Sequence, residues 1–131
     1  MAETDLHRQL MTALIEALED RFAADPSIYV SGNLLLFYVP GNKRKHVSPD
    51  VFVVFGVPKR RRINYLMWEE GRGPGAVIEL TSSSTRNEDV RTKFALYQDV
   101  LQVPEYFLFD PYDDYLEPRF QGYRLVGGRF L

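Results

Sequence analysis

The segment Ala76-Val77-Ile78-Glu79-Leu80-Thr81 places a carboxylate in the middle of an apolar β-strand. Alternation along a strand puts Val77, Glu79 and Thr81 on one face. A charge buried among apolar side chains is unfavourable unless a partner or a cation accompanies it. The segment therefore predicts both a core strand and a candidate functional carboxylate.

A second carboxylate, Asp50, follows Pro49 at the head of another apolar strand, Val51-Phe52-Val53-Val54. The length of this apolar run favours burial on both faces of a sheet. Two neighbouring carboxylates repel each other, and the pKa of one rises unless a cation lies between them. Mg²⁺ meets that need, since it prefers oxygen ligands and is commonly held by one or two carboxylates together with waters and substrate phosphate.

A lysine lies on the inner face of the helix predicted to begin near Arg86 and to end near Leu101. Its start is indicated by a capping box, Thr85 with Glu88. Lys93 falls in the apolar arc that this helix presents at about 100° per residue, together with Val90, Phe94, Leu96, Tyr97, Val100 and Leu101. Two interpretations remain open. Lys93 pairs locally with Asp89, or it extends to Asp50 and Glu79, where it orients a water or stabilises charge on a phosphate.

The remaining periodicities predict an α/β fold of one domain, residues 1–131, in which helices flank a mixed β-sheet. Residues 5–24 have the apolar spacing of a helix. Residues 28–39, 47–55, 76–81 and 105–110 read as strands, with a bulge or bend at Gly32-Asn33. Residues 115–130 are typical of a C-terminal β-hairpin whose last turn lies near Gly127-Gly128.

Composition narrows the class of protein. The chain of 131 residues has no cysteine and two histidines, which excludes thiolate sites and disfavours a histidine-rich zinc site. It contains no apolar run of about 20 residues and no signal peptide. We therefore expect a cytoplasmic protein with no membrane partner and no organic cofactor.

Two basic clusters flank the Asp50 strand, although the net charge of −2 gives no overall basic field. They are either solvated loops or phosphate contacts. Arg86 has the same two interpretations. The candidate nucleic-acid contacts are therefore Lys43, Arg44, Lys45, Arg60, Arg61, Arg62 and Arg86.

The motif formed by Pro49-Asp50, a gap and Glu79 resembles the PD-(D/E)XK nuclease superfamily. The usual lysine two residues after the glutamate is replaced here by Thr81. A known variation moves that lysine to the following helix, where Lys93 lies. Residues 77–86, Lys93, Tyr97 and residues 103–111 are similar to the Uma-type restriction-endonuclease-like family, as are residues 49–58 and 68–71.

The resemblance covers essentially the whole chain and implies a restriction-endonuclease-like core. It implies that Asp50 and Glu79 bind Mg²⁺ or Mn²⁺, with the backbone carbonyl of Leu80 as a further ligand, and that Lys93 takes the place of the catalytic lysine. The implied reaction is metal-assisted hydrolysis of a DNA phosphodiester.

Several alternatives remain beside this hypothesis. His7 is more consistent with a packed histidine than with a ligand, while Glu16 or Asp20 could add a carboxylate, although solvated surface acids are the default. A catalytically inactive relative that binds nucleic acid or a protein is the competing function, since Thr81 departs from the motif. A nuclease with one site per chain is expected to form a homodimer, with the hairpin as a candidate contact surface.

Overall fold

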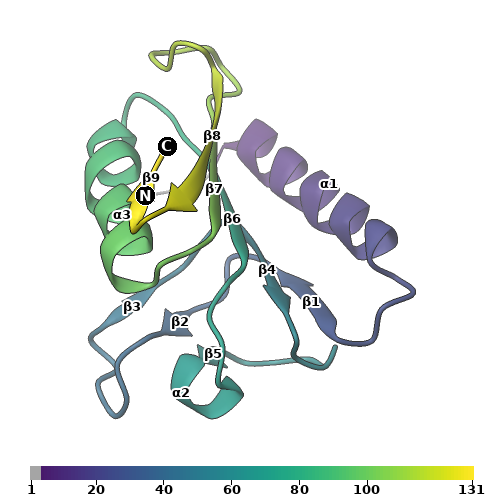
Figure 1. Ribbon diagram of the computed structural model, residues 1–131. Helices are drawn as coiled ribbons and strands as arrows, with labels where there is room; N and C mark the ends of the chain where they lie inside the picture. Colours follow the sequence, from purple (N-terminus) through teal and green to yellow (C-terminus); the bar gives the residue numbers. More distant parts are fainter. Residues whose placement is uncertain (1–3) are drawn as a thin grey trace.

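The computed structural model describes residues 4–131, which form a mixed six-stranded sheet with helices on either side (Figure 1). Only β6 and β7 are parallel, and every other neighbouring pair in this sheet is antiparallel. In spatial order the strands are β1 (Ile28–Ser31), β4 (Val51–Phe55), β6 (Ala76–Leu80), β7 (Glu105–Phe109), β8 (Phe120–Val126) and β9 (Arg129–Phe130).

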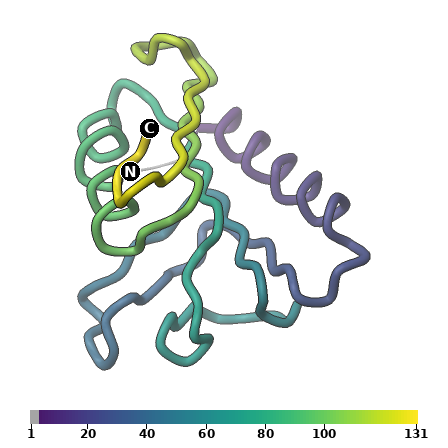
Figure 2. The backbone as a smooth tube through the Cα atoms, viewed as in Figure 1, coloured from purple at the N-terminus to yellow at the C-terminus, as the bar shows by residue number. Residues whose placement is uncertain are grey.

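A second, three-stranded sheet consists of two-residue strands in the order β3-β2-β5. They are β2 (Leu36–Phe37), β3 (His46–Val47) and β5 (Tyr65–Leu66). The backbone tube follows the excursion between β2 and β3 as a loop that projects away from the large sheet (Figure 2).

The single strand predicted over residues 28–39 is wrong, because the chain leaves the large sheet at the bend predicted for Gly32-Asn33. Asn33 has a φ of 52°, and its N–H donates to the Pro49 carbonyl at 2.8 Å. A Cβ at Gly32 would lie 2.1 Å from the Asp50 carbonyl oxygen, so only glycine allows this approach. The strand predicted over 47–55 is likewise interrupted between β3 and β4, and Asp50 lies in that interruption.

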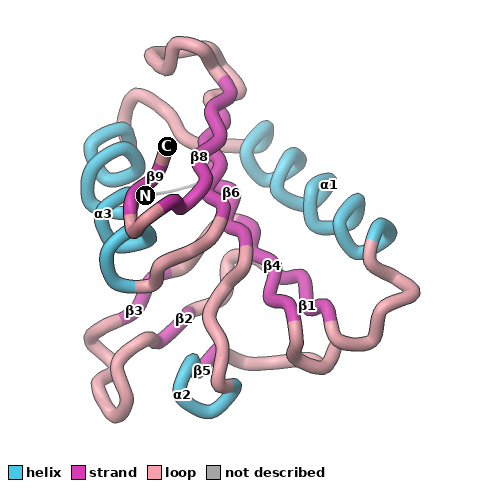
Figure 3. The backbone as a smooth tube through the Cα atoms, in the orientation of Figure 1, coloured by secondary structure: helices cyan, strands magenta, loops and turns pink. Residues whose placement is uncertain are grey.

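The helices lie on opposite sides of the large sheet (Figures 1 and 3). The first, α1 (Asp5–Arg21), contacts β1 and β4, and the short α2 (Met67–Glu70) follows β5. The third helix begins at Arg86 and is continuous over η1 (Glu88–Thr92), α3 (Lys93–Ala95) and η2 (Leu96–Val100), and we call it the α3 helix. In the part of the chain that the structure describes, no helix is long and apolar enough to cross a membrane.

The α3 helix is wound more widely than the prediction assumed. In η1 and η2 the hydrogen bonds span five residues, as in that from the Lys93 N–H to the Glu88 carbonyl. A spacing of 100° per residue therefore does not hold along the whole helix. Val100, which was expected in the buried arc, is 58% exposed, whereas Tyr97 is fully buried.

The main core lies between the large sheet, the α3 helix and the small sheet, and aromatic rings fill much of it. Tyr29, Phe52 and Tyr65 join the two sheets, and Tyr97 packs against Tyr106 with ring centroids 5.0 Å apart. These contacts fix the α3 helix over β6 and β7, so the polar side chains on its inner face point at the end of the sheet where the candidate site lies.

The predicted C-terminal hairpin is present but short. Strands β8 and β9 pair through Leu125↔Phe130 and Val126↔Arg129, and Gly127 and Gly128 form the turn with φ of 59° and 82°. Positive φ at both positions is the requirement of a type I′ turn. Residues 115–119 lie outside the strands, and most of β8 pairs with β7 instead.

Candidate active site

The antiparallel pairing of β4 with β6 brings the start of one strand beside the end of the other. Asp50 and Glu79 meet at this point, although 28 residues separate them in the sequence. The Leu80 N–H donates to Oδ2 of Asp50 at 2.8 Å, and the Asp50 N–H donates to Oε1 of Glu79 at 3.4 Å. Backbone donors of each strand therefore hold the carboxylate of the other.

Glu79 is fully buried and has partners on both carboxylate oxygens. The Tyr97 hydroxyl donates to Oε2 at 2.6 Å, and Nζ of Lys93 lies 3.4 Å from Oε1. Burial raises the pKa of Glu79 to about 8; Lys93 and Tyr97 oppose this rise, while the nearby charge of Asp50 adds to it. The carboxylate is thus poised to gain a further positive partner.

Lys93 makes the local contact with Asp89 and also extends to Glu79. Its ammonium contacts Glu79 and also lies 3.7 Å from Oδ1 of Asp89, four residues earlier on the helix. Burial disfavours the charged form, yet the carboxylates of Glu79, Asp89 and Asp50 raise the pKa of Lys93 above its ordinary value. Lys93 therefore stays an ammonium ion at neutral pH, with its side chain 18% exposed.

Asp89 is a site residue that the sequence interpretation treated only as a local partner of Lys93. It is buried, Oδ2 accepts from the Thr85 hydroxyl at 2.7 Å, and its carbonyl accepts from the Tyr106 hydroxyl at 3.0 Å. The helix begins at Arg86 as predicted. The signal for Asp89 in the sequence was its own place in the apolar arc, one turn before Lys93.

These side chains border a cavity of about 360 Å³. Asp50, Leu80 and Lys93 lie on one side of it, and the loop of Ser82 and Ser84 lies beside them. The N-cap Thr4 and the N-terminal half of α1, through His7 and Met11, complete the wall. Glu79 itself does not line the cavity, although Asp50 and Lys93, which contact it, do.

His7 was interpreted as a packed histidine, but it also lines the cavity at Asp50. Its ring does pack near Tyr112, with centroids 5.9 Å apart. Its Nε2 is buried and finds no hydrogen-bond partner among residues 4–131, and the side chain borders the same cavity as Asp50. Periodicity along the helix could not place His7 at the site, since the cavity forms only when α1 packs across the sheet.

The oxygen donors at this point suit a hard divalent cation. Within residues 4–131, no group of three or more His, Cys, Asp and Glu side chains is arranged to hold a metal ion. The candidate ligands are therefore two carboxylates, Asp50 and Glu79, which leave most positions around an ion to water and substrate, as Mg²⁺ prefers. Glu16 and Asp20 are exposed on α1 and do not border the cavity.

Thr81 lies two residues after Glu79 on the same strand face, and it is completely buried. Its hydroxyl shares a hydrogen bond with that of Tyr115. A lysine would place an ammonium in this closed position, which is unfavourable without a paired charge. The cation beside Glu79 comes instead from the helix, as Lys93.

The predicted phosphate contacts differ in how exposed their cationic groups are and in whether a carboxylate of the chain pairs with them. Lys43, Arg44 and Lys45 are exposed on the loop before β3, and Arg86 is exposed with its guanidinium 5.3 Å from the centre of the Tyr115 ring. The side chain of Arg62 is only 3% exposed and forms two hydrogen bonds to Glu70, and that of Arg60 bonds to the same carboxylate. Arg62 is thus part of the fold rather than of an accessible surface.

Comparison with known proteins identifies the family of the chain. The Uma2 family, described as "Putative restriction endonuclease", matches residues 1–129. The chain belongs to the Uma2 family. A comparison with curated proteins finds no match.

The fold of this Uma2 family member is similar to a crystal structure described as a putative nuclease belonging to DUF820 from Anabaena variabilis. The TM-score is 0.64 at 12% sequence identity, and the match covers 95% of this chain and 70% of that one. At this identity the likeness establishes the nuclease-like fold, while the roles of individual residues rest on the site itself.

Proposed function

We infer that the protein is a divalent-metal-dependent endonuclease that hydrolyses DNA phosphodiester bonds. One observation carries the proposal: Glu79 on β6 is hydrogen-bonded to both Asp50, just before β4, and Lys93 on the α3 helix, and the latter two line a single cavity. Membership of the Uma2 family supports the same class of reaction.

Asp50 and Glu79 would hold Mg²⁺ or Mn²⁺, with the Leu80 carbonyl as a further ligand. When bound, such an ion polarises a phosphoryl oxygen and lowers the pKa of an attacking water. The protein's own contribution is to hold the two carboxylates in place by hydrogen bonds. The Leu80 N–H holds Asp50, and the Tyr97 hydroxyl orients Glu79 from beneath.

Lys93 supplies a positive charge at the site in addition to that of a bound metal ion. Its raised pKa keeps the ammonium charged, and Asp89 and Glu79 limit its freedom to turn away. A fixed ammonium stabilises negative charge that develops on a phosphate during attack by water, and it can also orient that water.

Phosphate contacts outside the cavity are assigned to the exposed cations Lys43, Arg44, Lys45, Arg60, Arg61 and Arg86. We propose a homodimer that acts in the cytoplasm, because one site per chain cuts one strand of a duplex. Phe120 and Val126 on β8 are exposed and offer an apolar contact for a second copy. An equilibrium sedimentation mass of one chain would remove the dimer from the proposal.

The deciding experiment is nicking of supercoiled plasmid with Mg²⁺, with Mn²⁺ and with EDTA. The wild type should nick only with a metal, and Lys93→Ala should reduce the rate by about 10²–10³-fold. Arg91→Ala, which removes an exposed charge from the same helix, is the matched control and should retain the rate.

Binding is read separately from cleavage by thermal unfolding. A saturating metal at about 100 times its Kd adds about 2.7 kcal/mol to the free energy of unfolding. Mn²⁺ should therefore raise the Tm of the wild type by several degrees, but not that of Asp50→Ala or Glu79→Ala. Absence of both nicking and a metal-dependent Tm shift would instead support an inactive relative that binds nucleic acid or a protein.

A further inference from the structure

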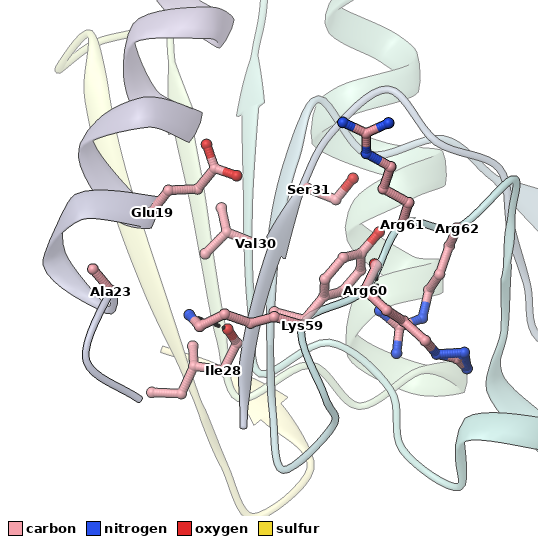
Figure 4. Close-up of a pocket in the computed structure, with 10 residues that line it drawn as sticks. Glu19, Ala23, Ile28, Val30, Ser31, Lys59, Arg60, Arg61 and Arg62 are labelled. Carbon is pink, nitrogen blue, oxygen red and sulfur yellow. Dashed lines mark hydrogen bonds between the residues drawn. The ribbon is translucent and has the colours of Figure 1, made fainter. Parts of the chain in front are cut away.

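A second hollow runs along the outer edge of β1, between the C-terminal half of α1 and the basic loop of residues 59–62 (Figure 4). Its volume is about 580 Å³, which is larger than the cavity at Asp50. Ten residues line it, of which four are cationic and one, Glu19, is acidic. With Glu70, which pairs with Arg60 and Arg62, the local formal charge is about +2, in contrast with the net charge of −2 for the whole chain. We call this hollow the β1 groove.

The four cations in the β1 groove are not equivalent. Nζ of Lys59 donates to the carbonyls of Phe22 and Ile28 at 2.9 and 2.8 Å, and the side chains of Arg60 and Arg62 bond to Glu70. Arg61 is exposed, and no hydrogen bond or ion pair within residues 4–131 engages its guanidinium. Arg61 is therefore the cation free to bind an anion from outside.

The β1 groove leads toward the candidate active site. In Figure 4, Lys59 lies at the Ile28 end of β1, whereas the guanidinium of Arg61 extends toward the end that carries Ser31. Directly after Ser31 the chain packs on the segment before β4, where the Asn33 N–H donates to the Pro49 carbonyl. The Ser31 end of the groove thus lies next to the segment that holds Asp50.

We propose that the β1 groove binds the phosphodiester backbone of one nucleic-acid strand on its way to the Asp50–Glu79 site, with Arg61 as the principal phosphate contact. The statement that the strand leads to the Asp50–Glu79 site rests on the proposed nuclease function. The test of binding in the β1 groove does not depend on cleavage. At about 3.3 Å per residue, β1 spans about 13 Å, which corresponds to about four nucleotides of a duplex strand at 3.4 Å each.

Two features favour a nucleic-acid backbone over an added β-strand from a protein. Nζ of Lys59 donates to the Ile28 carbonyl on the unpaired edge of β1. This carbonyl is therefore not available to the backbone of an added strand. The wall opposite α1 also presents cationic side chains rather than apolar pockets for alternate residues of a peptide. A chain of evenly spaced negative charges fits this surface better.

The test measures binding of a fluorescein-labelled 20-nucleotide DNA, single-stranded and as a duplex, by anisotropy in EDTA. Wild type, Arg61→Ala, Glu19→Gln and Arg129→Ala are compared between 50 and 200 mM salt. Arg129 is exposed on β9 at the opposite edge of the sheet and controls for the loss of one charge. We expect Arg61→Ala to weaken binding about five- to tenfold and to lower the slope of log K against log salt by about 1.

Glu19→Gln should strengthen binding, because it removes the carboxylate that faces the cations, and Arg129→Ala should leave the affinity and slope as in the wild type. Equal losses in Arg61→Ala and Arg129→Ala would overturn the proposal, as would displacement of the DNA by a poly-glutamate peptide of the same charge. Because EDTA prevents metal-dependent cleavage, Arg61-dependent binding without plasmid nicking would retain the β1 groove and reject the nuclease.

Discussion

Two glutamates of this protein are largely buried beside a cation, and their environments act in opposite directions. Hydrogen bonds from Arg62 lower the pKa of Glu70, with burial opposing them and Arg60 adding a further ion pair. Burial raises the pKa of Glu79, and the 3.4 Å contact with Lys93 does not offset it. Arg60 and Arg62 therefore compensate the negative charge of Glu70 within the fold, whereas Lys93 compensates that of Glu79 only in part.

The difference indicates what each pair contributes. The guanidinium of Arg62 meets Glu70 with two hydrogen bonds of 2.8 and 3.1 Å and stacks 4.2 Å from the centre of the Tyr29 ring, so it fixes the 59–62 loop against the core. Glu79 instead lies near a second carboxylate, Asp50, under a cavity. Perturbed groups of this second kind occur where a protein binds or reacts.

The largest expected effect is on nicking, from replacing each carboxylate by its amide. Glu79→Gln should reduce metal-dependent plasmid nicking by about 10³-fold, equivalent to about 4 kcal/mol, because it removes a ligand charge. Glu70→Gln should retain the rate under conditions where it stays folded, since Glu70 contacts Arg60 and Arg62 and neither Asp50 nor Lys93. Single-turnover rates with Mn²⁺ measure both, and comparable losses in the two variants would contradict the division of roles.

The second largest expected effect is on the free energy of unfolding and concerns the Arg62–Glu70 ion pair. Glu70→Ala leaves the buried guanidinium of Arg62 without its partner and should lower the free energy of unfolding by about 3 kcal/mol in urea titration. The control is Glu69→Ala, a neighbouring exposed glutamate on α2, for which a change within about 0.5 kcal/mol is expected. If Glu70→Ala were as mild as its neighbour, the Arg62–Glu70 pair would not anchor the loop.

Periodicity predicted the strand of Glu79, the position of Asp50 before the next strand, and a helix with Lys93 inside, because long apolar segments carry a clear signal. It merged β1 with β2 and β3 with β4 into single strands and missed β5, since two-residue strands have no period of their own to detect. It also assumed a regular helix, so the exposure of Val100 could not be foreseen.

The partners of charged residues were the least predictable feature. Arg62 belongs to a run of four basic residues that looked like one surface, yet its carboxylate partner lies eight residues further along the chain. Nothing in the sequence separates it from Arg61, which is free. Likewise, the Asp89 and Glu79 contacts of Lys93 were treated as alternatives, because spacing along a helix gives no information about the sheet below it.

The smallest expected effect is a pH dependence that differs in sign between the two glutamates. Glu79 has an ordinary pKa of 4.5 that the fold raises to about 8, so its contribution to stability is fully present below pH 4.5 and is lost as the pH rises toward 8. The pKa of Glu70 is lowered, so its contribution is present above pH 4.5 and is lost as the pH falls through the folded-state value.

In EDTA, wild type should therefore lose stability relative to Glu79→Gln progressively between about pH 5 and 8, because glutamine keeps a neutral side chain in the same place. Glu70→Gln should differ most from wild type at neutral pH and approach it in acid. Urea midpoints at half-unit pH steps measure both differences. Parallel curves for wild type and Glu79→Gln would mean that Lys93 and Tyr97 already neutralise Glu79, and the site would then have no unmet charge to attract a cation.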